Sequence, residues 1–70
     1  MSNPINLEMD PKKLTLALAR SCMSVPDLAK KTGIPAGTIH NIKARPKTRP
    51  KTAGKIAKAL GVDVTELLKD

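Results

Sequence analysis

Residues 24–42 read SVPDLAKKTGIPAGTIHNI, and this stretch decides the fold. Its first half predicts a helix that begins at Ser24, because a serine side chain can cap free amides and Pro26 is tolerated in the first turn. Asp27, three residues after the cap, favours the positive end of that helix. Gly33 stands where a tight turn between two helices needs a residue that tolerates positive φ. The stretch therefore predicts two short helices joined at a tight corner.

The second helix of this stretch, expected over residues 36–43, has two unlike faces. Ile39 and Ile42 lie three residues apart, which places both on one side of the helix, toward the core. The opposite side carries small or uncharged residues, namely Gly37, His40, Asn41 and Ala44, with Ala36, Thr38 and Lys43 on the flanks. A merely solvated helix normally presents Glu and Lys on its outer side. We therefore expect this face to lie close to another surface.

Acidic residues are missing from the middle of the chain. The 70 residues include 13 Lys and Arg against 6 Asp and Glu, which gives a net charge of +7. Nine of the 13 cations lie between Asp27 and Asp63, where there is no carboxylate. Because a foldable apolar pattern carries this charge, the natural partner is a polyanion, above all DNA. Net charge alone is also compatible with an anionic membrane or an acidic protein as the partner, so the choice among these partners depends on residue spacing.

A basic segment, residues 43–51 with the sequence KARPKTRPK, follows the second helix. Its two prolines, Pro46 and Pro50, hold the chain extended, so that successive cations can follow a phosphate strand. We favour phosphate binding over an ordinary solvated charge run for this segment. Its phosphate-binding candidates are Lys43, Arg45, Lys47, Thr48, Arg49 and Lys51. Lys55 and Lys58, further along, are expected to be plain solvated helix positions.

Start and stop signals predict three further helices. The first runs over residues 11–21 behind an Asp-Pro start signal. Another begins at residue 50 and is ended by Gly61 in the left-handed region. Gly54 inside this helix costs about 0.8–1 kcal/mol against alanine and can permit a close helix contact. Residues 63–66 have the spacing of a capping box and begin a short last helix.

Length and composition indicate a single all-α domain with a thin core. Phe, Tyr and Trp are absent, so the core is built from aliphatic residues, which suits closely packed helices better than a sheet. The expected core residues are Leu14, Leu18, Leu28, Ile34, Ile39, Ile42, Ile56 and Leu60. Residues 1–9 show no sustained period and are interpreted as an N-terminal arm that can be flexible, without assigned structure. The single Cys22 cannot form an internal disulfide, and no apolar run approaches the roughly 18 residues of a membrane span.

The order of these features resembles a known family. The residues that carry the resemblance are Leu28, Ala29, Gly33, Ile34, Ile39 and Ile42, which fall on the helix-turn-helix pattern. The chain from about Leu14 to Leu68 is similar to the Cro and phage-repressor (XRE-type, lambda-repressor-like) DNA-binding domains, because residues 49–68 also match their fourth and fifth helices. The resemblance implies a compact five-helix domain over residues 10–70, with the helix-turn-helix at the second and third helices.

The mechanism that the resemblance implies places the helix that starts at Ala36 in the major groove. The preceding helix then crosses the DNA backbone and is anchored by its first amides, near Ser24 and Val25. Asn41 can form a paired hydrogen bond to adenine, worth about 1–3 kcal/mol of discrimination, and the methyl group of Ala36 can meet a thymine methyl. The base-reading candidates are Ala36, Gly37, Thr38, His40 and Asn41.

The chain departs from the family pattern at three positions. Val25 stands where many members carry a glutamine that touches phosphate, and Thr32 replaces an apolar residue. Pro35 takes the place of the Ser or Thr that usually caps the recognition helix. The missing cap should lower the stability of the helix by about 1 kcal/mol. Because two reading positions are Ala36 and Gly37, one domain should discriminate bases weakly. Two half-sites, the basic segment and DNA shape must then contribute more.

The expected function is that of a sequence-specific, double-stranded-DNA-binding transcriptional regulator of the repressor kind, which acts as a homodimer on a palindromic operator. Dimer contacts are expected from the last helix, at Val62, Val64 and Leu68. The alternative is an antitoxin or protein-binding adaptor whose DNA binding serves autoregulation. One His, one Cys and carboxylates confined to the two ends predict no enzyme, metal site or cofactor. We further expect no small-molecule ligand, no membrane partner and a cytoplasmic location.

Overall fold

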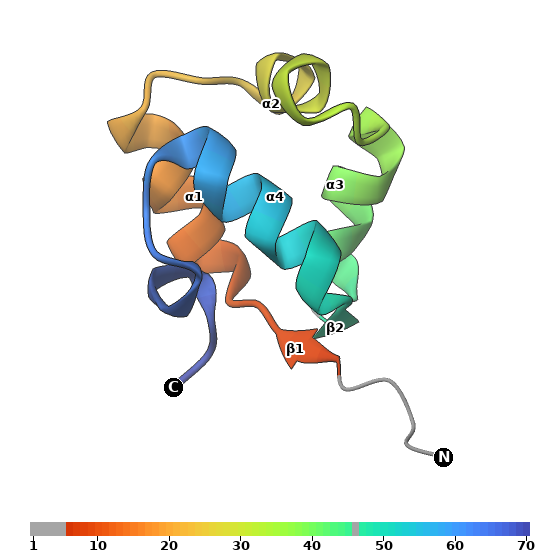
Figure 1. Ribbon diagram of the computed structural model, residues 1–70, viewed down its shortest axis with the longest axis vertical. Helices are drawn as coiled ribbons and strands as arrows, with labels where there is room; N and C mark the ends of the chain where they lie inside the picture. The colour runs from red at the N-terminus through yellow and green to blue at the C-terminus, as the bar shows by residue number, and fades with distance from the viewer. Residues whose placement is uncertain (1–5, 46) are drawn as a thin grey trace.

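The computed structural model describes residues 6–45 and 47–70, and it is mostly helical (Figure 1). Its elements in chain order are β1 (Leu7–Glu8), α1 (Pro11–Arg20), α2 (Val25–Thr32), α3 (Ala36–Ala44), β2 (Lys47–Thr48), α4 (Pro50–Leu60) and the 3-10 helix η1 (Val64–Leu67). Figure 1 shows α4 running between α1 and α3, with α2 across one end. The all-α prediction is thus confirmed in its main part, and a two-stranded sheet is added to it. No helix in the described part of the chain is long and apolar enough to cross a membrane.

Helix α1 begins as its start signal predicts. The Asp10 side chain accepts a hydrogen bond from the Lys12 amide at 2.9 Å, and proline follows the cap. Leu14 is fully buried, together with Ala17 and Leu18 of the same stripe. The helix ends in a Schellman turn, in which the amides after the last turn bond back to its carbonyls. Cys22 occupies the left-handed position of that turn with φ +53°, a position that usually holds glycine.

The corner between α2 and α3 follows the predicted turn chemistry. Ser24 and Asp27 form a reciprocal capping box at the start of α2. Gly33 ends the helix with φ +77°. The hydroxyl of Thr32 donates to the Leu28 carbonyl at 2.7 Å and accepts from the Ile34 amide at 3.1 Å. This pair of bonds gives a reason for a threonine where the family pattern has an apolar residue.

Helix α3 separates its two faces as predicted. Ile39 is fully buried and Ile42 is 4% exposed, so both contribute to the core. The helix extends one residue beyond the predicted range, to Ala44. Pro35 stands at its cap position without any side-chain hydrogen bond, as its chemistry requires.

Helix α4 also has its predicted bounds. Pro50 occupies its first turn, and Gly61 ends it with φ +70°. The apolar stripe of this helix is buried, comprising Ala53, Ile56, Ala57 and Leu60. Gly54 does not mediate a close helix contact, contrary to the expectation, because a Cβ built there meets nothing within 4 Å. It lies on the exposed side of the helix.

The prediction of five helices is wrong in its count. The described chain has four α-helices, and the last element is a single turn of 3-10 helix. Its capping box is present, and the Glu66 amide bonds to the Asp63 carbonyl at 2.9 Å, a spacing of three residues. Leu68 already has an extended backbone. The hydrogen bonds of this turn thus join residues three apart, as in a 3-10 helix, and the turn ends where the backbone becomes extended.

Residues just before α1 are ordered, although the sequence assigned them no structure. Strand β1 pairs antiparallel with β2, with Leu7 opposite Thr48 and Glu8 opposite Lys47. Met9 is fully buried and forms a bridge with Leu68. A strand of two residues shows no alternation of side chains, so the sequence carries no period by which to recognise it. The part of the predicted arm at residues 1–5 lies outside the described residues.

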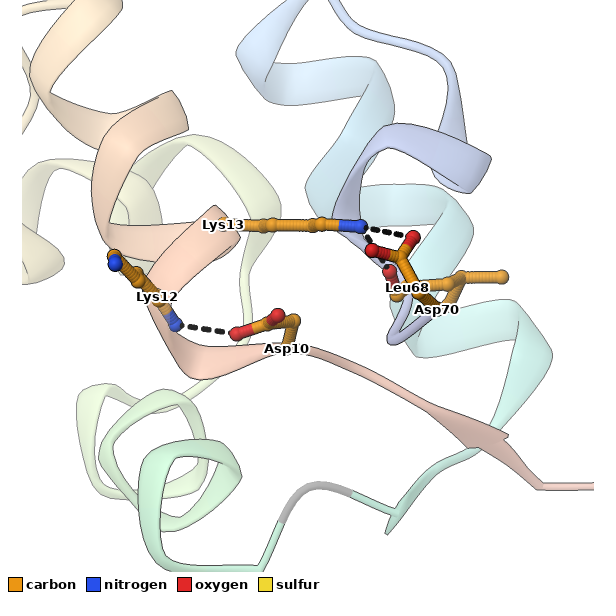
Figure 2. A network of polar contacts seen from close by, with 5 residues as sticks. All are labelled: Asp10, Lys12, Lys13, Leu68 and Asp70. Carbon is orange, nitrogen blue, oxygen red and sulfur yellow. Dashed lines mark hydrogen bonds and ion pairs between the residues drawn. The ribbon is translucent and has the colours of Figure 1, made fainter.

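Lys13 joins α1 to the C-terminal segment through hydrogen bonds (Figure 2). Its Nζ donates to the Leu68 carbonyl at 2.9 Å and to Asp70 Oδ1 at 2.8 Å. Its side chain is 29% exposed. Lys13 therefore serves the fold and does not lie free for solvent or phosphate, whereas Lys12 is exposed.

Candidate nucleic-acid interface

The outer face of α3 is open to solvent. Gly37, Thr38, His40 and Asn41 are exposed, and Ala36 is half-buried. A Cβ added to Gly37 would meet nothing within 4 Å. Four of the five predicted base-reading positions are thus exposed in the described chain, whereas Ala36 packs partly against the core.

A hollow of about 400 Å³ joins this face to the basic segment. It lies between the second half of α3, strand β2 and the first turn of α4, and its lining residues are Thr38, Asn41, Ile42, Arg45, Lys47, Thr48, Arg49 and Thr52. An amide, hydroxyls and three cationic side chains therefore converge here, and no carboxylate lines the hollow. Hydroxyl, amide and cationic groups are those that contact phosphates and base edges in DNA complexes.

The structure adds Thr52 to the site, a residue that the sequence reasoning missed. It lines the hollow together with Arg49, which lies three residues earlier and caps α4. Residues three apart on a helix share a face. Placing the helix start at Pro50 and then applying this spacing would have pointed to Thr52.

The basic segment alternates between exposed and buried side chains. Lys47 and Arg49 are exposed, whereas Thr48 between them is only 5% exposed. Successive residues of an extended chain point to opposite sides, so Lys47 and Arg49, two residues apart, share the outer side. The Thr48 side chain points inward and is not available to a phosphate, which corrects the prediction for this residue. Arg45 and Lys51 are exposed as expected, and the side chain of Lys43 lies outside the described part.

The start of α2 offers fewer free amides than expected. The Ser24 amide donates to Asp27 Oδ2 at 3.0 Å, the Asp27 amide donates to the Ser24 hydroxyl at 3.2 Å, and Pro26 has no N–H. The hydrogen bond from the Ser24 backbone, with a smaller one from its hydroxyl, lowers the pKa of Asp27 below 3.8. The carboxylate is therefore ionised at neutral pH and opposes an anion at this end. Val25 is 8% exposed, so only its main chain can contact a phosphate at the start of α2.

The ion pairs that the structure gives among the described residues lie away from this hollow. Lys13 pairs with Asp70 at 2.8 Å. The other two pairs are Arg20 with Glu66 at 3.8 Å and Lys69 with Glu8 at 3.4 Å. All three join the N-terminal part of the chain to its C-terminal segment. Three carboxylates thus join the two ends of the described chain, and one of them, Glu8, also lies beside Arg45 and Lys47.

The predicted dimer residues are only partly accessible. Val62, Val64 and Leu68 are half-buried and pack against the core. Among the described residues the large apolar side chain that is most exposed is Leu16 of α1, at 54%. Leu16 and Val62 line one hollow of about 230 Å³ between α1 and the C-terminal turn. The sequence reasoning missed Leu16, because the periodicity of α1 only shows which side faces inward.

The described residues include no group of three or more His, Cys, Asp and Glu side chains that could hold a metal ion. Cys22 is an exposed free thiol. The chemistry at this surface is therefore that of hydrogen-bond donors, acceptors and fixed positive charge.

Comparison with known proteins agrees with this geometry. The sequence model of the Cro/C1-type helix-turn-helix DNA-binding domain matches residues 13–70. No curated protein and no solved structure matches the chain. The matched range runs from the third residue of α1 past η1, and it includes the corner at Gly33, the open face of α3 and the hollow beside it. The chain belongs to the Cro/C1-type helix-turn-helix DNA-binding family.

Proposed function

We propose that this protein is a transcriptional repressor that reads a specific DNA sequence with the outer face of α3. The observation that carries the proposal is the joint surface of that face and the cationic hollow beside it, where Asn41 lies next to Arg45 and Arg49. Asn41 can read adenine in the major groove, while the two arginines bind the flanking phosphates. Base recognition and phosphate binding then come from one continuous surface.

We further propose that the protein binds as a homodimer to a palindromic operator with half-sites one helical turn apart. One α3 presents few base-reading groups, because Ala36 and Gly37 carry almost no side chain. Two copies double the number of base contacts. The hollow lined by Leu16 and Val62 carries the most exposed large apolar side chain of the described residues, and a second copy would gain apolar contacts there. Val64 and Leu68, both half-buried, are proposed as further dimer contacts.

Selection of bound duplexes from a random pool tests the proposal. We expect a palindromic motif to be enriched, and we expect Asn41→Ala to lose about 1–3 kcal/mol of discrimination at one position of each half-site. Thr15→Ala, on the exposed side of α1 and outside this surface, is the control for loss of a polar side chain. The absence of an enriched motif, or a protein that stays monomeric on its DNA at micromolar concentration, would contradict the repressor proposal.

The alternative function, an antitoxin or adaptor that binds another protein, has one observation in its favour. Lys31, Lys55 and Lys58 line a hollow of about 340 Å³ between α2 and α4, and no residue of α3 takes part in it. An acidic protein could bind there while α3 stays on DNA. Replacing all three lysines with glutamine should leave DNA binding almost intact and abolish capture of an acidic protein partner, if this function is the right one.

A further inference from the structure

Strand β1 lies beside the basic segment. It pairs with β2 in the register Leu7 to Thr48 and Glu8 to Lys47. Figure 1 shows the two strands together where α3 ends and α4 begins. Glu8 also lines a hollow with Ala44, Arg45 and Lys47. The N-terminal strand therefore contacts the chain that carries the phosphate-binding candidates.

The position of β1 is fixed independently of this pairing. Met9, the next residue, is fully buried and forms a bridge with Leu68. The Lys69 amide donates to the Glu8 carbonyl at 2.9 Å, and the Asp10 amide donates to the Leu67 carbonyl at 2.8 Å. These bonds join β1 to the C-terminal segment. Strand β1 is thus held by the C-terminal segment, and β2 pairs with this held strand.

Pairing with this strand determines which side chains of the basic segment face outward. Thr48 faces inward at 5% exposure, and its neighbours Lys47 and Arg49 are exposed. These two cations are about 6.6 Å apart along an extended chain. A shift of the pairing by one residue would turn Thr48 outward and the cations inward. The register therefore controls whether the charges meet the DNA.

We propose that the Leu7–Glu8 strand is a positioning element for DNA binding, which holds the basic segment in its binding conformation before DNA arrives. This inference rests on the proposed function, since it assumes that Lys47 and Arg49 bind phosphates. A segment that is already ordered avoids paying conformational entropy on binding. Leu7 supports DNA binding indirectly, because it pairs with β2 and packs against the core without touching DNA.

The variant Leu7→Pro tests this role, because proline has no N–H to donate within a strand pair. We expect its affinity for a duplex to fall about tenfold, and we expect the amides of Lys47 and Thr48 to exchange faster in the free protein. The matched control is Asn6→Pro, an exposed position just outside the strand, which should bind as the natural chain does. Ala19→Gly, on the exposed side of α1, controls for a general loss of stability.

A double-mutant cycle separates positioning from a merely structural effect. If β1 acts by placing Arg49, then Arg49→Ala should cost less affinity in the Leu7→Pro background than in the natural chain. Strictly additive losses, or full affinity of Leu7→Pro, would overturn the inference. Leu7→Ala replaces Leu7→Pro in the cycle if the proline variant does not fold. Failure of the natural chain to bind any duplex would instead overturn the proposed function, and the exchange of the Lys47 and Thr48 amides would still report on the strand.

Discussion

Gly37 is a residue whose presence the free protein does not explain. It lies within α3, and a Cβ at this position would meet nothing within 4 Å. Glycine in the interior of a helix costs about 0.8–1 kcal/mol relative to alanine. The free chain gains no packing in return. A DNA surface that comes very close to α3 supplies a physical reason for the missing side chain.

Gly37→Ala and Gly54→Ala form a matched pair that tests this reason. Both glycines have open space around them, but Gly54 lies in the interior of α4 and Gly37 is the second residue of α3. In urea denaturation Gly54→Ala should therefore raise the free energy of unfolding by about 0.8–1 kcal/mol, and Gly37→Ala should raise it by less. Only Gly37→Ala should weaken DNA binding, by about tenfold, which corresponds to 1.4 kcal/mol. Equal DNA affinity of the two variants would show that α3 does not approach DNA at this position.

At the scale of the elements, the capping box of α2 makes stability depend on pH. The Ser24 backbone N–H and hydroxyl stabilise the charged form of Asp27, so its pKa in the folded protein is below the ordinary value of 3.8. A group with a depressed folded pKa contributes stability above its unfolded pKa, and that contribution is lost as the pH falls through the folded pKa. Acid should therefore weaken the start of α2 before it weakens the apolar core.

The variant Asp27→Asn tests this dependence. We expect it to lower the free energy of unfolding at neutral pH and to have less effect in acid, once the pH has fallen through the folded pKa of Asp27. Urea denaturation at neutral and at acidic pH measures the difference. Asp63→Asn is a control, because the Asp63 cap belongs to η1 and leaves the DNA-facing helices intact. A pH-independent effect of Asp27→Asn would mean that the charge does not contribute to the cap.

The charges of the described chain are unevenly distributed, with ion pairs between its two ends and a group of cations beside α3. Its ends are joined by carboxylates that pair with Lys13, Arg20 and Lys69. The hollow between α3 and α4 has cations and no carboxylate. With a net charge of +7, this separation turns one side of the protein toward a polyanion and gives a binding affinity that depends strongly on salt.

The slope of log affinity against log salt measures how many of these cations meet phosphates. Arg49→Ala should reduce the slope by about 0.9 for each half-site, because one phosphate contact is lost. Lys12→Ala removes the same charge from α1, outside the hollow, and should leave the slope almost unchanged. Equal slopes for Arg49→Ala and the natural chain would remove Arg49 from the interface.

Local chemistry in the sequence was enough to predict the four α-helices and, to within about one residue, their ends. The caps at Asp10 and Ser24, the left-handed glycines at 33 and 61, and the inward side of α3 involve residues at most four positions apart. Such contacts form within a single turn, so the residues themselves carry the signal. The outer face of α3 was predicted for the same reason, as the complement of Ile39 and Ile42.

Contacts between distant residues were decided only by the tertiary structure. The pairing of Leu7 with Thr48, the bonds of Lys13 to residues 68 and 70, and the placing of Thr52 beside Asn41 join segments that are far apart or belong to different elements. None of these contacts leaves a period or a local motif in the sequence. The sequence by itself therefore determined the four α-helices, the charge and the outer face of α3. Packing decided that Thr48 turns inward, that η1 stays a single turn, and that the N-terminal strand lies against the basic segment, because each depends on which surfaces meet once the chain has folded.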